Sequence, residues 1–177
     1  MNKTAIAAVL AGACLGPSAM AESDLYVAGG YSAFDGGGAT LNTLTLRGGM
    51  AFHEIFGAEF EASFGLGAED IGSSAGTQVE LENQFGAYLV GRYPVARDLD
   101  VLARLGYTTG EYQSSTNGVT GDAEVDGLAF GLGGEYMFTD QFGVRADYTR
   151  IEAEDDSFDG GIDVFAISGV FKFGDLR

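Results

Sequence analysis

The stretch from Phe56 to Gly67, FGAEFEASFGLG, alternates between apolar residues and small or polar ones. Apolar side chains occupy every second position from Phe56 to Leu66, and Glu59 and Glu61 stand between them. A period of two is typical of a β-strand with one apolar and one polar face. Three environments are open to the two carboxylates: bulk water, an active site or a closed interior. Each environment implies a different kind of protein.

The chain of 177 residues suits one domain. Its first residues resemble an export signal, with Lys3, an apolar run over 5–15 and the small-x-small sequence Ala19-Met20-Ala21. The apolar run is too short to cross a bilayer as a helix. These features predict a signal peptide over 1–21 and one mature domain over 22–177.

Cys14, the single cysteine, lies inside this predicted signal peptide. Lipidation of Cys14 is the alternative to ordinary cleavage, but Ala11 stands where a lipoprotein signal usually has Leu. Cleavage is therefore the favoured reading, and it leaves a mature chain without thiol or disulfide chemistry.

Runs with a period of two recur along the rest of the chain, and each is long enough to cross a bilayer as a tilted strand. They predict eight strands, at 24–34, 40–52, 56–67, 77–93, 99–109, 125–138, 142–151 and 162–173.

The predicted connections alternate in length. Short turns are expected at 53–55, 94–98 and 139–141, and longer polar loops at 35–39, 68–76, 110–124 and 152–161. Short turns on one side and long loops on the other are typical of a bacterial outer-membrane barrel. The predicted fold is thus all-β, an eight-stranded antiparallel up-and-down transmembrane β-barrel.

The two faces of the predicted strands differ in charge. One face is nearly all apolar, as in Leu44, Leu46, Met50 and Phe52. The other is small or polar, and its sparse charges match in number: Arg47, Arg92, Arg104, Arg145 and Lys172 against Glu59, Glu61, Asp100, Glu135 and Asp147.

A solvated face would carry the excess negative charge of the chain, whereas a balanced set indicates a confined interior in which ions pair. We therefore expect these ten residues to form a lumen charge network, with Arg47–Glu59 and either Arg104 or Arg145 with Glu135 among its pairs, and the phenylalanines to face lipid. The alternative is a soluble barrel with the apolar face inside, which would need a more polar outer face.

Four segments together resemble the small eight-stranded outer-membrane barrels of the opacity-protein and OmpA-barrel type. They are LRGGMAFHEIFGAEFEASFGLG (46–67), VLARLGYTTGEY (101–112), GLAFGLGGEYMFTDQFGVRADYTRIEAED (127–155) and AISGVFKF (166–173). The chain departs from that family in lacking Trp and in ending with Gly174-Asp175-Leu176-Arg177 after Phe173, where such barrels end on an aromatic residue. The resemblance implies a monomer in the outer membrane of a Gram-negative-type bacterium, with outer-membrane lipid around it.

The formal charge is −17, which argues against nucleic acid as a partner. Outside the predicted barrel interior the loops and rim are acidic, which predicts divalent cations or basic surface partners there. The acidic residues are Asp35, Glu69, Asp70, Glu80, Glu82, Glu111, Asp122, Glu124, Asp126, Glu154, Asp155, Asp156 and Asp159.

Three candidate sites were weighed against simpler interpretations. The single histidine, His53, is expected in a solvated turn rather than in a catalytic site, which would need a serine and an acid beside it. Glu59 and Glu61 are expected to form salt bridges rather than an acid–base pair. Asp155, Ser157 and Asp159 resemble the start of a calcium loop, but Ala166 stands where its bidentate Glu is required.

The sequence therefore predicts neither catalytic nor cofactor-binding residues. It predicts an outer-membrane barrel with a structural or surface-interaction role and acidic loops outside. A narrow porin-like channel for ions or small solutes is the alternative, because the predicted lumen is polar.

Overall fold

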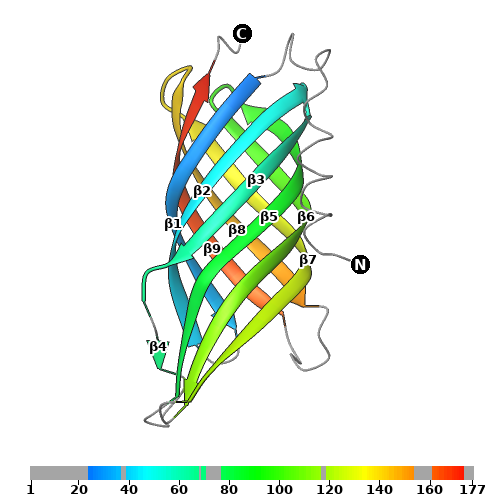
Figure 1. Cartoon of the computed structure of the whole chain (residues 1–177). Helices are drawn as coiled ribbons and strands as arrows, with labels where there is room; N and C mark the ends of the chain where they lie inside the picture. Colours follow the sequence, from blue (N-terminus) through cyan, green and yellow to red (C-terminus); the bar gives the residue numbers. More distant parts are fainter. Residues whose placement is uncertain are drawn as a thin grey trace.

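The computed structural model describes residues 24–36, 39–67, 69–70, 77–116, 119–153 and 161–173. They form one closed antiparallel sheet, with strands in the order β3-β2-β1-β9-β8-β7-β6-β5-β4 and the wall closed by pairing between β3 and β5 (Figure 1). The strands are β1 (Asp24–Gly36), β2 (Ala39–His53), β3 (Phe56–Gly65), β4 (Glu69–Asp70), β5 (Thr77–Ala96), β6 (Leu99–Thr116), β7 (Val119–Met137), β8 (Phe142–Ala153) and β9 (Ile162–Phe173).

Eight of these strands form the barrel wall, as the sequence predicts. The ninth, β4, has two residues and pairs with the start of β5, where it lengthens the sheet below β3. Among the described residues no helix has the length and apolarity needed to cross a membrane.

The barrel has two distinct ends. At the turn end, β1 begins, β9 ends, and tight turns at 54–55, 97–98 and 138–141 join consecutive strands. At the loop end, β1 pairs with β2 as far as Gly36 and Ala39, so the loop expected over 35–39 is largely strand.

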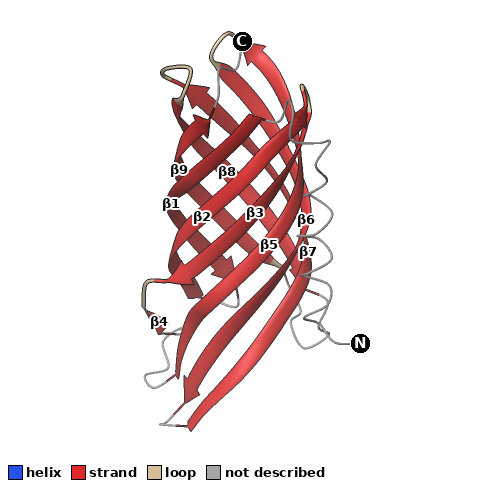
Figure 2. Cartoon of the chain, turned by 45° about the horizontal axis from the view of Figure 1, so that its top comes forward, coloured by secondary structure: helices blue, strands red, loops and turns tan. Residues whose placement is uncertain are grey.

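The larger correction concerns the loop expected over 110–124. In the structure β6 continues to Thr116 and β7 begins at Val119, and the two strands stay paired to their ends. Figure 2 shows β5, β6 and β7 running past the other strands as a three-stranded extension. Because Gln, Ser, Thr, Asn and Gly dominate 113–121, the segment lacks the apolar alternation that marks the rest of the wall.

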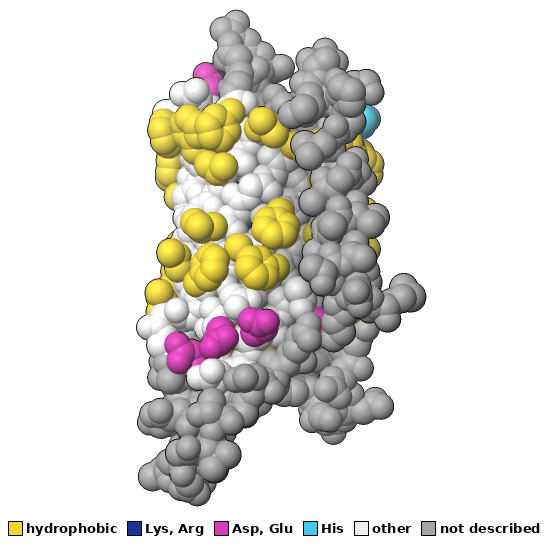
Figure 3. Space-filling model, in the orientation of Figure 1, with side chains coloured by type: hydrophobic (Ala, Val, Ile, Leu, Met, Phe, Trp, Pro, Cys, Tyr) yellow, Lys and Arg dark blue, Asp and Glu magenta, His cyan; other side chains and the backbone are white. Residues whose placement is uncertain are grey.

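The apolar face of the strands points outward. Leu89, Leu132 and Ile167 are each at least 60% exposed, and apolar side chains form bands around the face shown in Figure 3. This orientation excludes the soluble barrel with an apolar interior, and an outward apolar wall with all backbone groups paired is what a bilayer requires.

Aromatic side chains lie at both margins of this wall. At the turn end the exposed rings are Phe52, Phe56, Tyr93, Tyr136, Phe138, Phe142 and Phe173. Toward the loop end, the Tyr31 hydroxyl donates to Asn42 and the Tyr148 hydroxyl donates to Asp163 at 2.6 Å. Rings with an apolar body and a polar tip suit the two membrane–water interfaces.

Candidate functional site: the charged lumen

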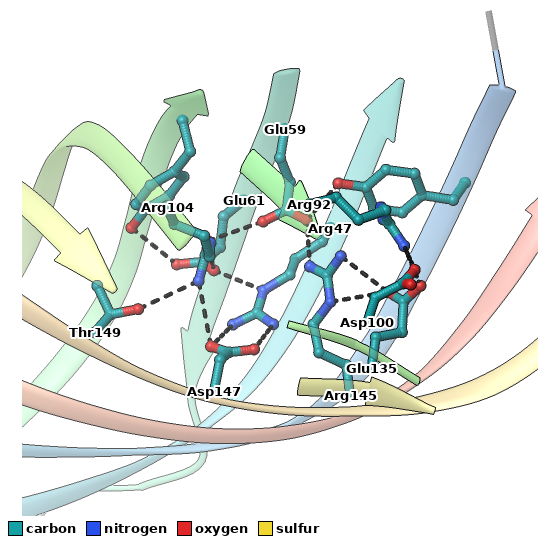
Figure 4. Close-up of polar contacts among 12 residues, drawn as sticks. Arg47, Glu59, Glu61, Arg92, Asp100, Arg104, Glu135, Arg145, Asp147 and Thr149 are labelled. Atoms are coloured by element: carbon teal, nitrogen blue, oxygen red, sulfur yellow. Dashed lines mark hydrogen bonds and ion pairs between the residues drawn. The ribbon is translucent and has the colours of Figure 1, made fainter. Parts of the chain in front are cut away.

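All ten residues predicted for the lumen charge network lie on the inward face of the barrel. Seven of its eight wall strands supply them, from Arg47 on β2 to Lys172 on β9. The alternation of each strand brings them inside, because neighbouring residues point to opposite faces of a sheet. Figure 4 shows nine of them facing one another across the interior.

Arg47, Arg104 and Asp147 form the middle of the network. The Arg47 guanidinium donates to both oxygens of Asp147, at 2.7 and 3.0 Å, and through Nε to Glu61 at 2.7 Å. Arg104 bridges Glu59 and Glu61 at 2.9 and 2.7 Å and reaches Asp147 at 3.3 Å. Arg47 thus pairs with Glu61, its direct neighbour across β2 and β3, rather than with Glu59 as expected.

Arg145 and Glu135 carry the network toward the turn end. Arg145 binds Glu59 at 2.5 Å and Glu135 at 3.1 Å. Glu135 also binds Arg92 at 2.5 Å and Lys172 at 2.8 Å. Arg104, the other partner considered for Glu135, turns instead toward Glu59, Glu61 and Asp147.

Two tyrosines complete the network, and the sequence analysis did not single them out. Tyr26 donates to Glu59 at 2.8 Å, and the Arg145 guanidinium lies 5.3 Å from the centre of its ring. The Arg104 guanidinium lies 4.0 Å from the ring centre of Tyr88. The alternation of β1 and β5 places both rings inward, so the pattern that located the charges was sufficient to find them.

Glycines make room for these rings. A Cβ added to Gly49 would lie 2.2 Å from Cζ of Tyr26, and one added to Gly106 would lie 2.6 Å from Cδ1 of Tyr88. Such distances are far below van der Waals contact, so at both positions any side chain would displace a ring. The inward glycines are therefore a condition for packing the network inside a narrow barrel.

Hydroxyl groups lie next to the network on the side of the loop end. Thr45 bonds to both Ser32 and Ser63 at 2.8 Å, and Thr43 donates to the Ser32 carbonyl at 3.2 Å. We call Ser32, Thr43, Thr45 and Ser63 the hydroxyl belt. It joins the neighbouring strands β1, β2 and β3 along the inner wall.

Apolar side chains fill the lumen at the loop end, which the sequence analysis did not predict. We call them the apolar plug: Phe34, Leu41, Leu81, Val125, Ile151, Ile162 and Val164, all buried, with Tyr112 packed against them. Simple alternation along the strand would place Leu81 on the outer face with Phe85. A register shift between Leu81 and Asn83 places it inside, where it is 1% exposed.

The other candidate residues lie in an exposed turn or outside the described part of the chain. His53 is exposed in the turn after β2, where its Nδ1 accepts a hydrogen bond from the Ile55 amide at 3.3 Å. The suggested calcium residues Asp155, Ser157 and Asp159 lie outside the described residues, as does the predicted signal peptide. Within the described part of the chain, His, Cys, Asp and Glu side chains form no group of three or more suited to a metal ion.

The outer rim at the loop end is acidic. The acidic residues of this rim whose side chains the structure describes are Asp35, Glu80, Glu82, Glu111, Asp126, Glu152 and Asp163. Arg150 is the one cation among the described residues of this rim, and it binds both oxygens of Asp163 at 2.9 Å and Glu152 at 3.2 Å. Acidic side chains are visible near the lower end of the face in Figure 3.

Solved structures share the barrel. The N-terminal barrel of OprF from Pseudomonas aeruginosa matches with a TM-score of 0.66 and 12% identity over 85% of this chain and 97% of that chain. OprG from the same organism matches with a TM-score of 0.65 and 13% identity over 86% of this chain and 96% of that chain. A third match is Ail from Yersinia pestis, in complex with the heparin analogue sucrose octasulfate. Its TM-score is 0.58, with 13% identity over 85% of this chain and 97% of that chain. A search of curated protein sequences finds no match.

The model of one protein family covers nearly the whole chain. It describes the outer membrane protein beta-barrel domain, and it matches residues 5–173. The closed wall, the outward apolar face and the charged interior agree with it. The chain therefore belongs to the outer membrane protein beta-barrel domain family.

Proposed function

We propose that this protein is a non-conducting barrel of the Gram-negative-type outer membrane, exported by its N-terminal signal peptide, whose role lies in the envelope structure and at the cell surface. The observation that carries this proposal is the filled lumen. Paired charges, hydroxyl groups and apolar side chains follow one another along its length, so side chains interrupt the path that a solute would take through the barrel. The same observation weighs against the narrow channel.

Contacts with other molecules then fall to the rim and the three-stranded extension at the loop end. Glu82 and Glu111 are exposed there and accept hydrogen bonds from Gln113 and Asn83, at 3.1 and 2.9 Å. Ail is seen with a polyanion, but an acidic rim repels polyanions and attracts basic groups. We therefore propose basic surface partners or divalent cations for this chain, and neither catalysis nor a cofactor.

Planar-bilayer recording tests the closed lumen. The chain from Glu22 onward, refolded and inserted, is expected to give no discrete current steps, while its unheated electrophoretic mobility confirms that it is folded. Reproducible openings from the folded wild-type chain would contradict the proposal and favour a channel.

Binding of a cationic peptide tests the surface role. Oligolysine should bind vesicles that carry the barrel, the binding should weaken with added salt, and sucrose octasulfate should not bind. Glu82→Gln with Glu111→Gln should reduce the binding, whereas Glu54→Gln with Asp140→Asn, the same charge change at the turn end, should not. Equal loss in both double variants would contradict a site at the loop end.

A further inference from the structure

We infer that the lumen is a blind chamber with two barriers in series: the charge network, which water and small ions reach from the turn end alone, and the apolar plug, which closes the loop end independently of it. This inference goes beyond the proposed function, because it states which half of the lumen is accessible and what removing either barrier would do.

The most exposed of the lumen charges lie near the turn end. The paired side chains of Arg92 and Asp100 are 16% and 20% exposed, and Lys172 is 8% exposed. Farther along the axis, the side chains of Arg104 and Asp147 are each 1% exposed. The turn end therefore has a polar entrance, and charged groups continue from it into the middle of the barrel.

Polar atoms in this half lack protein partners. Ser168 Oγ and Arg104 Nε are buried and have no hydrogen-bond partner among the described residues. A buried polar atom without a partner is costly, and bound water is the usual remedy. These atoms indicate that water enters the polar half of the lumen.

The apolar plug is of a different nature. Phe34 is 2% and Leu81 1% exposed, although both lie near the loop-end limits of the barrel wall. They sit on β1 and β5, so the plug closes the lumen from separated parts of the wall. An ion that crossed it would lose its hydration without gaining a polar partner, which makes an apolar constriction a barrier in its own right.

The two barriers are built from different kinds of interaction. The seven apolar residues of the plug carry no ionisable group, and the hydroxyl belt lies between them and the charge network on β1 and β2, whereas on β5 Tyr88 belongs to the same buried apolar cluster as the plug. Loss of an ion pair therefore leaves the plug as a barrier, and hydration of the plug leaves the paired charges as a barrier. Conduction requires both to be broken.

Three sets of variants, recorded in planar bilayers, test the series arrangement. Arg47→Gln with Glu61→Gln removes a salt bridge and keeps the net charge. Phe34→Ser with Leu81→Ser shortens and hydrates the plug. Each double variant alone should give no current, and the fourfold variant that combines them should give discrete channel openings. Current from either pair alone, or silence from the folded fourfold variant, would overturn the inference. Current from the wild-type chain would instead contradict the proposed function.

A second measurement does not depend on the folding of the fourfold variant. The chain from Glu22 has no cysteine, so Ser168→Cys and Val164→Cys introduce single thiols on the inward face of β9, one in the polar half and one in the plug. Silver ion added at the turn end should block the thiol of Ser168→Cys and leave that of Val164→Cys free. Reaction of Ser168→Cys from the loop end, or equal reaction of both thiols from the turn end, would refute the blind chamber.

Discussion

At the residue scale, the lumen is a set of charges that depend on one another. Which residues enter it follows from strand alternation and could be predicted for all ten. Their pairing could not, because a guanidinium on a long side chain reaches several carboxylates at similar distances. Arg47 illustrates this, since it spans the lumen to Asp147, 100 residues away along the chain, and binds Glu61 on the neighbouring strand rather than the expected Glu59.

Glu59→Gln should destabilise the barrel strongly. Glu59 is held by Arg104, Arg145 and Tyr26, and its neutralisation leaves two buried guanidinium groups short of an anion. The free energy of unfolding should fall by about 3–5 kcal/mol, as for other buried pairs that lose one partner. Urea unfolding in lipid vesicles measures it. Asp140→Asn in the exposed turn is the control, and an equal effect there would contradict the explanation.

Gly48 and Gly49 offer a matched pair on β2. A Cβ at Gly49 would overlap the Tyr26 ring, whereas one at Gly48 meets nothing within 4 Å. Gly49→Ala should therefore lower the unfolding free energy by about 1–3 kcal/mol through overpacking, and Gly48→Ala should leave it unchanged or raise it. If both variants unfold at the same urea concentration as the wild-type chain, the Tyr26 ring does not require glycine at position 49.

At the scale of elements, the wall strands could be predicted because an apolar outer face leaves an unmistakable period of two. The prediction fails where that face ends. Beyond residue 109 in β6 and before residue 125 in β7 the strands no longer carry an apolar stripe, and their pairing with each other, together with the pairing of β6 with β5, keeps them extended. The bulge that turns Leu81 inward leaves no mark in composition either, so this member of the plug escaped prediction.

The tip of the β6–β7 hairpin should be dispensable for the barrel. Replacement of residues 114–121 by Asn-Gly joins Gln113 and Asp122, which already lie opposite each other, through a turn suited to a hairpin. Because β8 covers β7 only from Gly127 onward, the unfolding free energy should change by less than about 1 kcal/mol, in keeping with the weak dependence of closure entropy on loop length. Loss of folding would show that the extension supports the wall.

At the scale of the whole molecule, charge is sorted by location. The ten lumen charges cancel, so the net charge of −17 resides outside the lumen. This division could be predicted from the sequence, since five of the nine Lys and Arg residues fall on the inward face. What the loops bind could not, because their residues follow no period that fixes their arrangement.

Insertion into anionic vesicles should depend on salt. The acidic rim is repelled by an anionic surface at low ionic strength, and salt screens this repulsion. Folding into vesicles that contain anionic lipid should therefore be a few-fold slower in 10 mM than in 200 mM salt, whereas zwitterionic vesicles should show little difference. Tyrosine fluorescence follows the rate. A salt effect of the same size in both lipids would point to a cause other than the rim.

The span of the lumen charge network in the sequence has a consequence for biogenesis. Its members come from early strands and late ones, as in Arg47 with Asp147 and Tyr26 with Arg145. A partly built sheet would carry these ions into the bilayer without their counterparts, at a prohibitive cost. The strands therefore cannot enter the membrane one after another. The polar side must stay sheltered until the last strand meets the first, so that closure of the wall and neutralisation of its interior occur as one event.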